Sequence, residues 1–193
     1  MNLLFISGPQ GGGKTTLLEA ISDERILIPQ LETKTTSFDV KPLNRIALKI
    51  CQRCLENFES YQVAIKNPDK IILGNRCIYD QLAFNWVYYK RGWITEERKN
   101  YFDEVPFNLY IEELREPRAI VLNPGYNIVK EHLEKRWLKK EKKWREEDEK
   151  YIKLVCESYD RFRDNDKIYY IDHEIDLKKK EEIDNIRKWI IRN

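Results

Sequence analysis

The sequence predicts an α/β fold, a three-layer sandwich in which helices cover both faces of a five-stranded parallel sheet. Five short runs rich in β-branched and apolar residues are each separated from the next by a segment with helical periodicity. The first run, residues 2–7, is nearly all apolar, which is typical of a strand that is buried on both faces. Strands that alternate with helices pack as right-handed crossovers, and such crossovers build a parallel sheet.

The expected elements follow one another in a regular order. The predicted strands cover residues 2–7, 25–28, 70–73, 119–122 and 167–171. The predicted helices begin at Lys14 and near Leu82, and cover 43–65, 95–104, 127–140, 146–162 and 177–191. Asn67-Pro68 is expected to end the long helix over 43–65, because proline cannot continue a helix. Thr95 is expected to cap the helix over 95–104.

Length and charge limit the classes of protein to be considered. A chain of 193 residues is expected to form a single domain over 1–193. Its 35 basic residues nearly balance its 33 acidic ones, which argues against a nucleic-acid-binding surface. No apolar run approaches the roughly 20 residues of a membrane helix, and the start of the chain lacks the basic region of a signal peptide. We therefore expect a cytoplasmic protein without a membrane partner, and a homodimer is compatible with these features.

The most specific motif directly follows the first predicted strand. Gly8, Gly13, Lys14 and Thr15 satisfy the P-loop pattern G-x-x-x-x-G-K-[ST] of proteins that bind nucleoside triphosphates. The glycines allow backbone N–H groups to turn toward phosphate oxygens, and the following helix adds the positive end of its dipole. We expect Lys14 to hold the β and γ phosphates of ATP and the Thr15 hydroxyl to ligate Mg²⁺. The predicted phosphate-binding set is Gly8, Gly11, Gly12, Gly13, Lys14, Thr15 and Thr16.

A second polar cluster follows the predicted strand 70–73. The chain there reads Gly-Asn-Arg-Cys-Ile-Tyr-Asp-Gln-Leu-Ala-Phe from residue 74 onward. Ligands of open α/β sheets bind at the carboxyl ends of the strands, so Arg76 is placed to reach an anionic substrate. A surface ion pair is the alternative for Arg76. Asp80 is expected either to contact the substrate or to complement the dipole of the next helix.

With these residues the sequence resembles the thymidylate kinase and deoxynucleoside kinase group of P-loop kinases. That group carries Asp-Arg, then a small or polar residue, and an Ala-Tyr or Ala-Phe step on the next helix; Asn75-Arg76 and Ala83-Phe84 match this frame. The resemblance implies an ATP-dependent kinase that acts on a nucleoside or nucleoside monophosphate, with Arg76 contacting the acceptor or its phosphate. Asn75 stands where the family has an aspartate that supports Mg²⁺, so the second contact of the metal is left unassigned.

The resemblance also implies a catalytic base after the second strand. In deoxynucleoside kinases a glutamate near this point acts on the acceptor hydroxyl, and Glu32 is the nearest candidate. Such a carboxylate orients the hydroxyl and takes its proton late in the transfer. Gln30 is an alternative occupant of the same place, and guanylate-kinase-like enzymes use a Thr-Thr-Arg stretch there.

A charged segment at about 136–148 resembles the lid of the same kinases. It follows Asn123-Pro124 and a predicted helix that contains Lys135-Arg136. The resemblance implies a helical lid whose arginines stabilise charge on the transferring phosphoryl group and exclude water, with Arg136 as the first candidate and Arg145 as the second. The alternative is a solvated helix with ion pairs between residues four apart.

Two further functions are compatible with the sequence. One is a kinase for another small hydroxyl compound, such as a cofactor precursor. The other is a nucleotide-dependent switch or interaction protein with slow hydrolysis, which Asn75 would favour. ATP consumption that depends on an acceptor distinguishes the kinases from the switch.

Overall fold

A five-stranded parallel sheet organises the structure. The computed structural model describes residues 2–29, 41–142 and 144–192. The strands are β1 (Leu3–Ser7), β2 (Ile26–Leu27), β3 (Ile71–Asn75), β4 (Ala119–Leu122) and β5 (Ile168–Ile171), in the order β2-β3-β1-β4-β5. All neighbouring strands pair in parallel, so the predicted sheet is confirmed.

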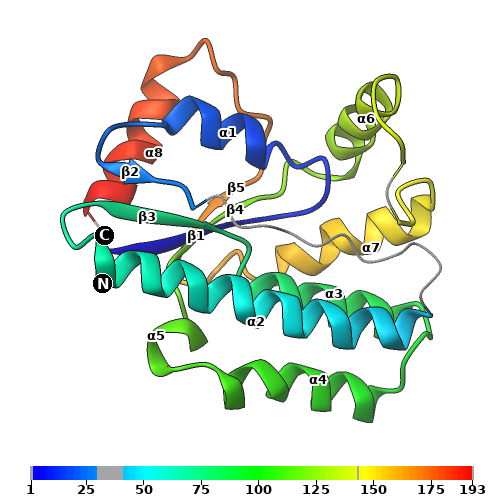
Figure 1. Ribbon diagram of the computed structural model, residues 1–193. Coiled ribbons are helices and arrows are strands. Elements are labelled where there is room, and N and C mark those ends of the chain that lie inside the picture. Colours follow the sequence, from blue (N-terminus) through cyan, green and yellow to red (C-terminus); the bar gives the residue numbers. More distant parts are fainter. Residues whose placement is uncertain (1, 30–40, 143, 193) are drawn as a thin grey trace.

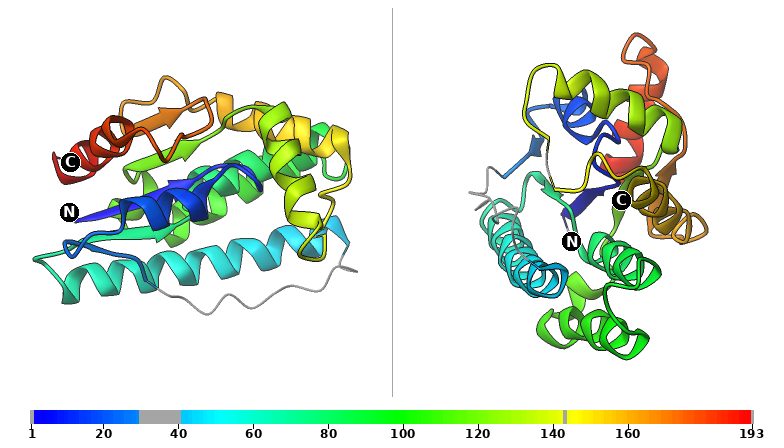
Figure 2. Two further views of the ribbon diagram at one scale, coloured as in Figure 1. Left: turned by 90° about the horizontal axis from the view of Figure 1, so that it is seen from above. Right: turned by 90° about the vertical axis from the view of Figure 1, so that its right-hand side faces the viewer.

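Helices cover both faces of this sheet. They are α1 (Lys14–Ile21), α2 (Pro42–Lys66), α3 (Ile78–Lys90), α4 (Glu96–Leu109), α5 (Glu112–Arg115), α6 (Tyr126–Trp137), α7 (Glu149–Asp160) and α8 (Lys180–Arg192). Figures 1 and 2 show α1 and α8 on one face and α2, α3 and α7 on the other, with α4 packed outside α2 and α3. None of the helices in the described residues is long and apolar enough to cross a lipid bilayer.

The packing of strand β1 explains why its sequence is apolar throughout. Leu3 and Phe5 join the hydrophobic cluster beneath α2 and α3, whereas Leu4 and Ile6 join the cluster beneath α1 and α8. Each of the four side chains is at most 1% exposed. A central parallel strand is buried on both faces, so that alternating side chains enter two cores instead of one.

Some helix ends differ from the predictions because a side chain caps the helix at another residue. Helix α3 begins at Ile78, four residues before Leu82, because the carboxylate of Asp80 accepts the backbone N–H of Cys77 at 2.9 Å and completes a capping box. The single-turn helix α5 was not predicted. The predicted cap of α4 is confirmed, since the Thr95 hydroxyl accepts the N–H of Arg98.

The charged segment at about 136–148 is less helical than predicted. Helix α6 ends at Trp137 instead of residue 140, and the described residues between it and α7 form turns. Helix α7 begins at Glu149 instead of Glu146, because Asp148 caps it by accepting the N–H of Tyr151 at 2.9 Å. Of the described residues in this segment, only 136 and 137 are helical, at the end of α6, which Figure 2 shows beside the loop between β1 and α1.

Candidate active site

The loop between β1 and α1 passes so close to β4 that glycine is required. Gly8 has φ 136°, and a Cβ atom there would lie 2.1 Å from the carbonyl oxygen of Leu122. Gly13, the N-cap of α1, has φ 90°, a left-handed conformation that L side chains rarely adopt. The loop thus delivers the N-terminus of α1, with its free N–H groups, to the carboxyl edge of the sheet.

Lys14 folds back over this loop. Its Nζ donates to the carbonyl oxygens of Gly8 at 2.8 Å and Pro9 at 2.7 Å. Burial, followed by the positive charge of Arg76, lowers the pKa of Lys14 well below its usual value. Anionic oxygens placed beside the ammonium would offset both effects, which is the environment a polyphosphate supplies.

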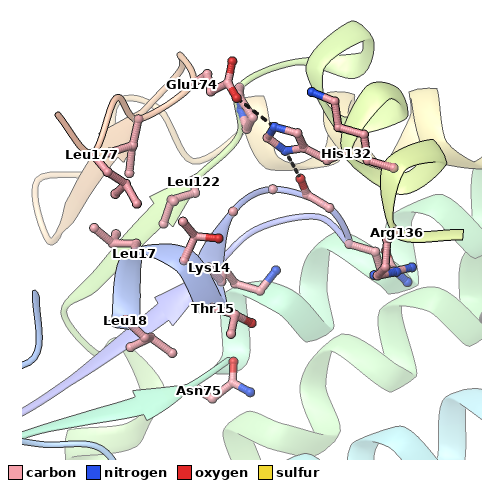
Figure 3. Close-up of a pocket in the computed structure, with 18 of the residues that line it drawn as sticks. Lys14, Thr15, Leu17, Leu18, Asn75, Leu122, His132, Arg136, Glu174 and Leu177 are labelled. Carbon is pink, nitrogen blue, oxygen red and sulfur yellow. Dashed lines mark hydrogen bonds and ion pairs between the residues drawn. The ribbon is translucent and has the colours of Figure 1, made fainter. Parts of the chain in front are cut away.

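A cavity of about 550 Å³ surrounds the loop, and most of the predicted site residues line it (Figure 3). They are Gly11, Gly12, Gly13, Lys14, Thr15, Thr16, Arg76 and Arg136. Gly8 does not line the cavity, but its carbonyl oxygen accepts a hydrogen bond from Lys14. Figure 3 shows the leucines at positions 17, 18, 122 and 177 gathered at one end of the cavity and Arg136 at the other, so one end is apolar and the other is basic.

Arg76 is held in a buried ion pair. Its Nη1 lies 2.5 Å from Asp80 Oδ1, and the two side chains are 16% and 2% exposed. The same Nη1 also contacts the carbonyl of Gly8 at 3.2 Å and the hydroxyl of Tyr159 at 3.3 Å. Among the described residues all hydrogen bonds of the guanidinium use Nη1, so Nε and Nη2 are left for a ligand. The ion pair considered as the alternative for Arg76 is therefore present, but it is buried and not at the surface.

Asp80 occupies the first turn of α3, as one of its two predicted roles requires, and it also forms the centre of a buried hydrogen-bond network. Besides Arg76 and the N–H of Cys77, its carboxylate accepts the hydroxyls of Ser7 and Tyr159, each at 2.6 Å. Burial alone raises the pKa of Asp80, but the charge of Arg76 and these hydrogen bonds outweigh it and lower the pKa. With its oxygens occupied in this way, Asp80 holds Arg76 in place and complements the start of α3, and it does not line the cavity around the P-loop.

The backbone of Arg76 is also fixed. Its φ of 67° lies in the left-handed region, which costs a non-glycine residue on the order of 1–3 kcal/mol. The N–H of Arg76 donates to the carbonyl of Ile6 at 2.8 Å, and its carbonyl accepts from Asn57 Nδ2 at 2.9 Å. Asn57 is in turn held by the hydroxyl of Tyr110 at 2.7 Å. This conformation directs Arg76 back toward the P-loop from the end of β3.

Helix α6 reaches the P-loop through two side chains. Arg136 lines the cavity, as predicted, but its guanidinium already pairs with the buried carboxylate of Glu146. His132, for which the sequence suggested no role, places Nδ1 2.8 Å from the carbonyl of Gly11 and Nε2 2.9 Å from Glu174. Both partners are acceptors, so the two hydrogen bonds form together only on a protonated imidazole. The four-residue spacing of His132 and Arg136 was the only sequence feature that placed them on one helix face.

Arg145, the second candidate for the lid, lies away from this cavity. The guanidinium of Arg145 lies over the rings of Trp93 and Trp144, at 5.4 and 5.7 Å, and the residue does not line the cavity. Glu32, like its alternative Gln30, lies outside the described residues.

A second cavity, of about 200 Å³, opens beside the first. It lies between α2 and α3, and it shares Gln10 and Arg76 with the cavity around the P-loop. Its other lining residues are Arg45, Ile46, Lys49, Arg53, Asp80, Gln81, Phe84, Tyr88, Trp144 and Tyr151. The sequence associated the acceptor with Arg76, which lines this cavity, but it did not identify the basic residues of α2.

Thr15 and Asn75 are the residues best placed for a metal ion. Both line the larger cavity, and Figure 3 shows their side chains near one another. The described part of the chain contains no group of three or more histidine, cysteine, aspartate or glutamate residues that could hold a metal ion. Mg²⁺ keeps several of its waters and takes few protein ligands beside substrate phosphates, so the Thr15 hydroxyl fits as a ligand and Asn75 offers an amide oxygen.

The fold is shared with solved structures of a deoxyadenosine kinase. No protein-family model and no curated protein sequence matches the chain, but solved structures do. A structure of deoxyadenosine kinase from M. mycoides with bound dATP matches with a TM-score of 0.70 and 21% identity, over 97% of this chain and 98% of that one. The same kinase with the products dCMP and a flexible dCDP bound matches with a TM-score of 0.68 and 17% identity, over 98% of both chains. With bound dCTP it matches with a TM-score of 0.59 and 18% identity, over 99% of this chain and 100% of that one.

Proposed function

We propose that this protein is an ATP-dependent kinase that transfers the γ-phosphoryl group to a nucleoside or nucleoside monophosphate. The observation that carries the proposal is the junction of the two cavities at Gln10 and Arg76. Phosphoryl transfer requires the donor phosphate and the acceptor to lie in line and close together, and catalysis depends mostly on that positioning. A loop that binds triphosphate, opening onto a separate pocket of small-molecule size, supplies this arrangement.

In this proposal, some residues of the two cavities bind the substrates and others stabilise the charge of the transferring group. Lys14 and the N–H groups of the P-loop hold the β and γ phosphates, and the apolar end of the larger cavity receives the base. The free Nε and Nη2 of Arg76 donate to the oxygens of the transferring group or of the acceptor. Arg136 at the end of α6 covers the phosphates and limits the access of water.

Two further groups complete the proposal. A bound Mg²⁺, held by Thr15 and phosphate oxygens, would neutralise charge on the triphosphate. Glu32 is the proposed base that orients the acceptor hydroxyl.

A cytoplasmic location and a homodimer stay predictions from the sequence.

The test is transfer of label from γ-labelled ATP, with Mg²⁺ present, to separate pools of nucleosides, nucleoside monophosphates, cofactor precursors and 5′-hydroxyl oligonucleotides. We expect label on one of the first two pools, and none with Lys14→Ala, because that change removes the cation that holds the transferring phosphate. Circular dichroism of the variant checks that its fold is intact. Wild-type activity in Lys14→Ala would exclude the P-loop as the site of the reaction.

The slow nucleotide-dependent switch is the second candidate. Asn75 favours it, because a neutral amide next to Thr15 binds Mg²⁺ less strongly than a carboxylate does. Phosphate release at the same slow rate with every acceptor pool would establish the switch in place of the kinase.

A further inference from the structure

Helix α2 presents a row of three basic side chains to the second cavity. Arg45, Lys49 and Arg53 all line it. Their four-residue spacing puts them on one side of the helix, about one turn apart. Each directly precedes a buried residue of the core, at positions 46, 50 and 54, so the row lies at the edge of the core and not on the outer face of α2.

Lys49 has no anionic partner among the described residues. Its Nζ donates to the neutral amide oxygen of Gln52 at 2.8 Å, and it forms no ion pair among the described residues. Arg53, in contrast, contacts Glu56 at 2.6 Å and the carbonyl of Asn75 at 3.0 Å. The guanidinium of Arg45 lies 4.4 Å from the centre of the Trp144 ring. Lys49 is thus an ammonium held between two guanidinium groups.

The described residues that line the cavity carry more positive than negative charges. Of its described lining residues, Asp80 is the one carboxylate, and Arg76 already occupies it. Glu56 does not line the cavity, and its carboxylate already forms an ion pair with Arg53. Burial, followed by the charges of Arg45 and Arg53, lowers the pKa of Lys49 to about 8. A half-buried ammonium among like charges is unfavourable by itself, and an anion bound in the cavity would relieve it.

We propose that the second cavity binds an acceptor that already carries a phosphate monoester, and that Lys49, flanked by Arg45 and Arg53, holds this phosphate. The inference rests on the proposed function in taking the occupant of this cavity to be the phosphoryl acceptor. A neutral nucleoside would leave the charge of Lys49 uncompensated, whereas a phosphate dianion compensates it and accepts several charge-assisted hydrogen bonds. The monoester belongs either to a nucleoside monophosphate or to another phosphorylated small molecule.

The experiment measures equilibrium binding by calorimetry on the full chain saturated with ADP and Mg²⁺, so that it does not depend on turnover. The probes are matched pairs: thymidine and its 5′-monophosphate, deoxyadenosine and its 5′-monophosphate, and ribose and ribose 5-phosphate. We expect at least one phosphorylated member to bind about tenfold or more tightly than its neutral partner. The pair that shows this preference identifies which phosphorylated class the cavity takes.

Lys49→Gln tests whether the preference comes from this side chain. We expect the variant to reduce the preference to about threefold or less while ADP binding stays unchanged. Lys66→Gln, at an exposed position on the same helix, is the matched control and should keep the preference. In the wild type the phosphorylated probe should bind less tightly as the pH rises from about 7 to about 9, since Lys49 then loses its proton, and Lys49→Gln should lack this decline.

Three outcomes would overturn the inference: no phosphorylated probe binds, both members of every pair bind equally, or Lys49→Gln keeps the wild-type preference. The failure of the kinase proposal gives a different result. If no pool accepts label from ATP but phosphate binding still depends on Lys49, the anion site stands and the kinase is excluded.

Discussion

The buried carboxylate of Asp80 holds the side chain of Arg76 at the junction of the cavities. Asp80→Asn keeps the shape of the side chain but removes the charge that compensates the guanidinium of Arg76. Removing one partner of a buried ion pair costs about 3–5 kcal/mol, so we expect a loss of free energy of unfolding toward the lower end of that range. Urea denaturation at pH 7 measures it, and Asp184→Asn, at a mostly exposed position, is the control and should cost far less.

The pH dependence of this loss follows from the lowered pKa of Asp80. Because the pKa is lower in the folded than in the unfolded protein, the stabilisation is present above the unfolded value, about pH 4, and is lost as the pH falls through the folded value. The stabilities of wild type and Asp80→Asn should therefore converge toward acid pH. A difference that stays constant between pH 7 and pH 3 would show that charge is not its cause.

The positions of single residues were predictable where local sequence determines them. Most of the P-loop set was correctly placed around one cavity because its pattern is contiguous, and Arg76 was placed there because it follows a strand at the carboxyl edge of the sheet. His132 was missed because its role arises only when α6 crosses over the loop, which no local pattern encodes. The charged row on α2 was missed for a related reason: its four-residue spacing is visible in the sequence, but the cavity that it faces is formed with α3.

At the scale of elements, α6 is tied to the P-loop by His132, and this contact should affect nucleotide binding. His132→Leu removes the hydrogen bond to the carbonyl of Gly11 and so loosens the loop before ATP binds. We expect the Kd for ATP to rise about fivefold, the effect of one hydrogen bond of ordinary strength. Calorimetric titration measures it.

The other histidine provides the control for this prediction. His173, in the loop after β5, pairs with Glu182 of α8 and does not line the cavity around the P-loop. His173→Leu should therefore leave the Kd for ATP unchanged. If the two variants behave alike, the contact of α6 with the loop has no part in binding the nucleotide.

The elements themselves were easier to predict than their ends. The five strands were found because each is a short apolar run between helical segments, and burial on both faces makes that pattern distinct. The starts of α3 and α7 were placed wrongly because each depends on one side chain, Asp80 or Asp148, accepting a backbone N–H. The lid was predicted as a longer helix because charge spacing alone does not show where turns replace helical hydrogen bonds.

At the scale of the whole molecule, the sheet joins the two hydrophobic clusters into one structure. Alternate residues of β1 and β4 enter the cluster beneath α2, α3 and α7 and the cluster beneath α1 and α8. Neither cluster can be exposed without removing one face of these strands from its packing. We therefore expect residues 1–193 to unfold as a single domain, in one thermal transition whose calorimetric and van't Hoff enthalpies agree.

ATP should stabilise this cooperative unit because its proposed site joins the P-loop, the end of β3 and helix α6. At about 100 times its Kd, ATP should add about 2.7 kcal/mol to the free energy of unfolding, provided that only the folded chain binds it. Differential scanning calorimetry with and without ATP and Mg²⁺ measures the shift in Tm, and Lys14→Ala should lose most of it. Two resolved transitions, of which ATP moves only one, would contradict the single domain, since they would show that the clusters on the two faces of the sheet unfold separately.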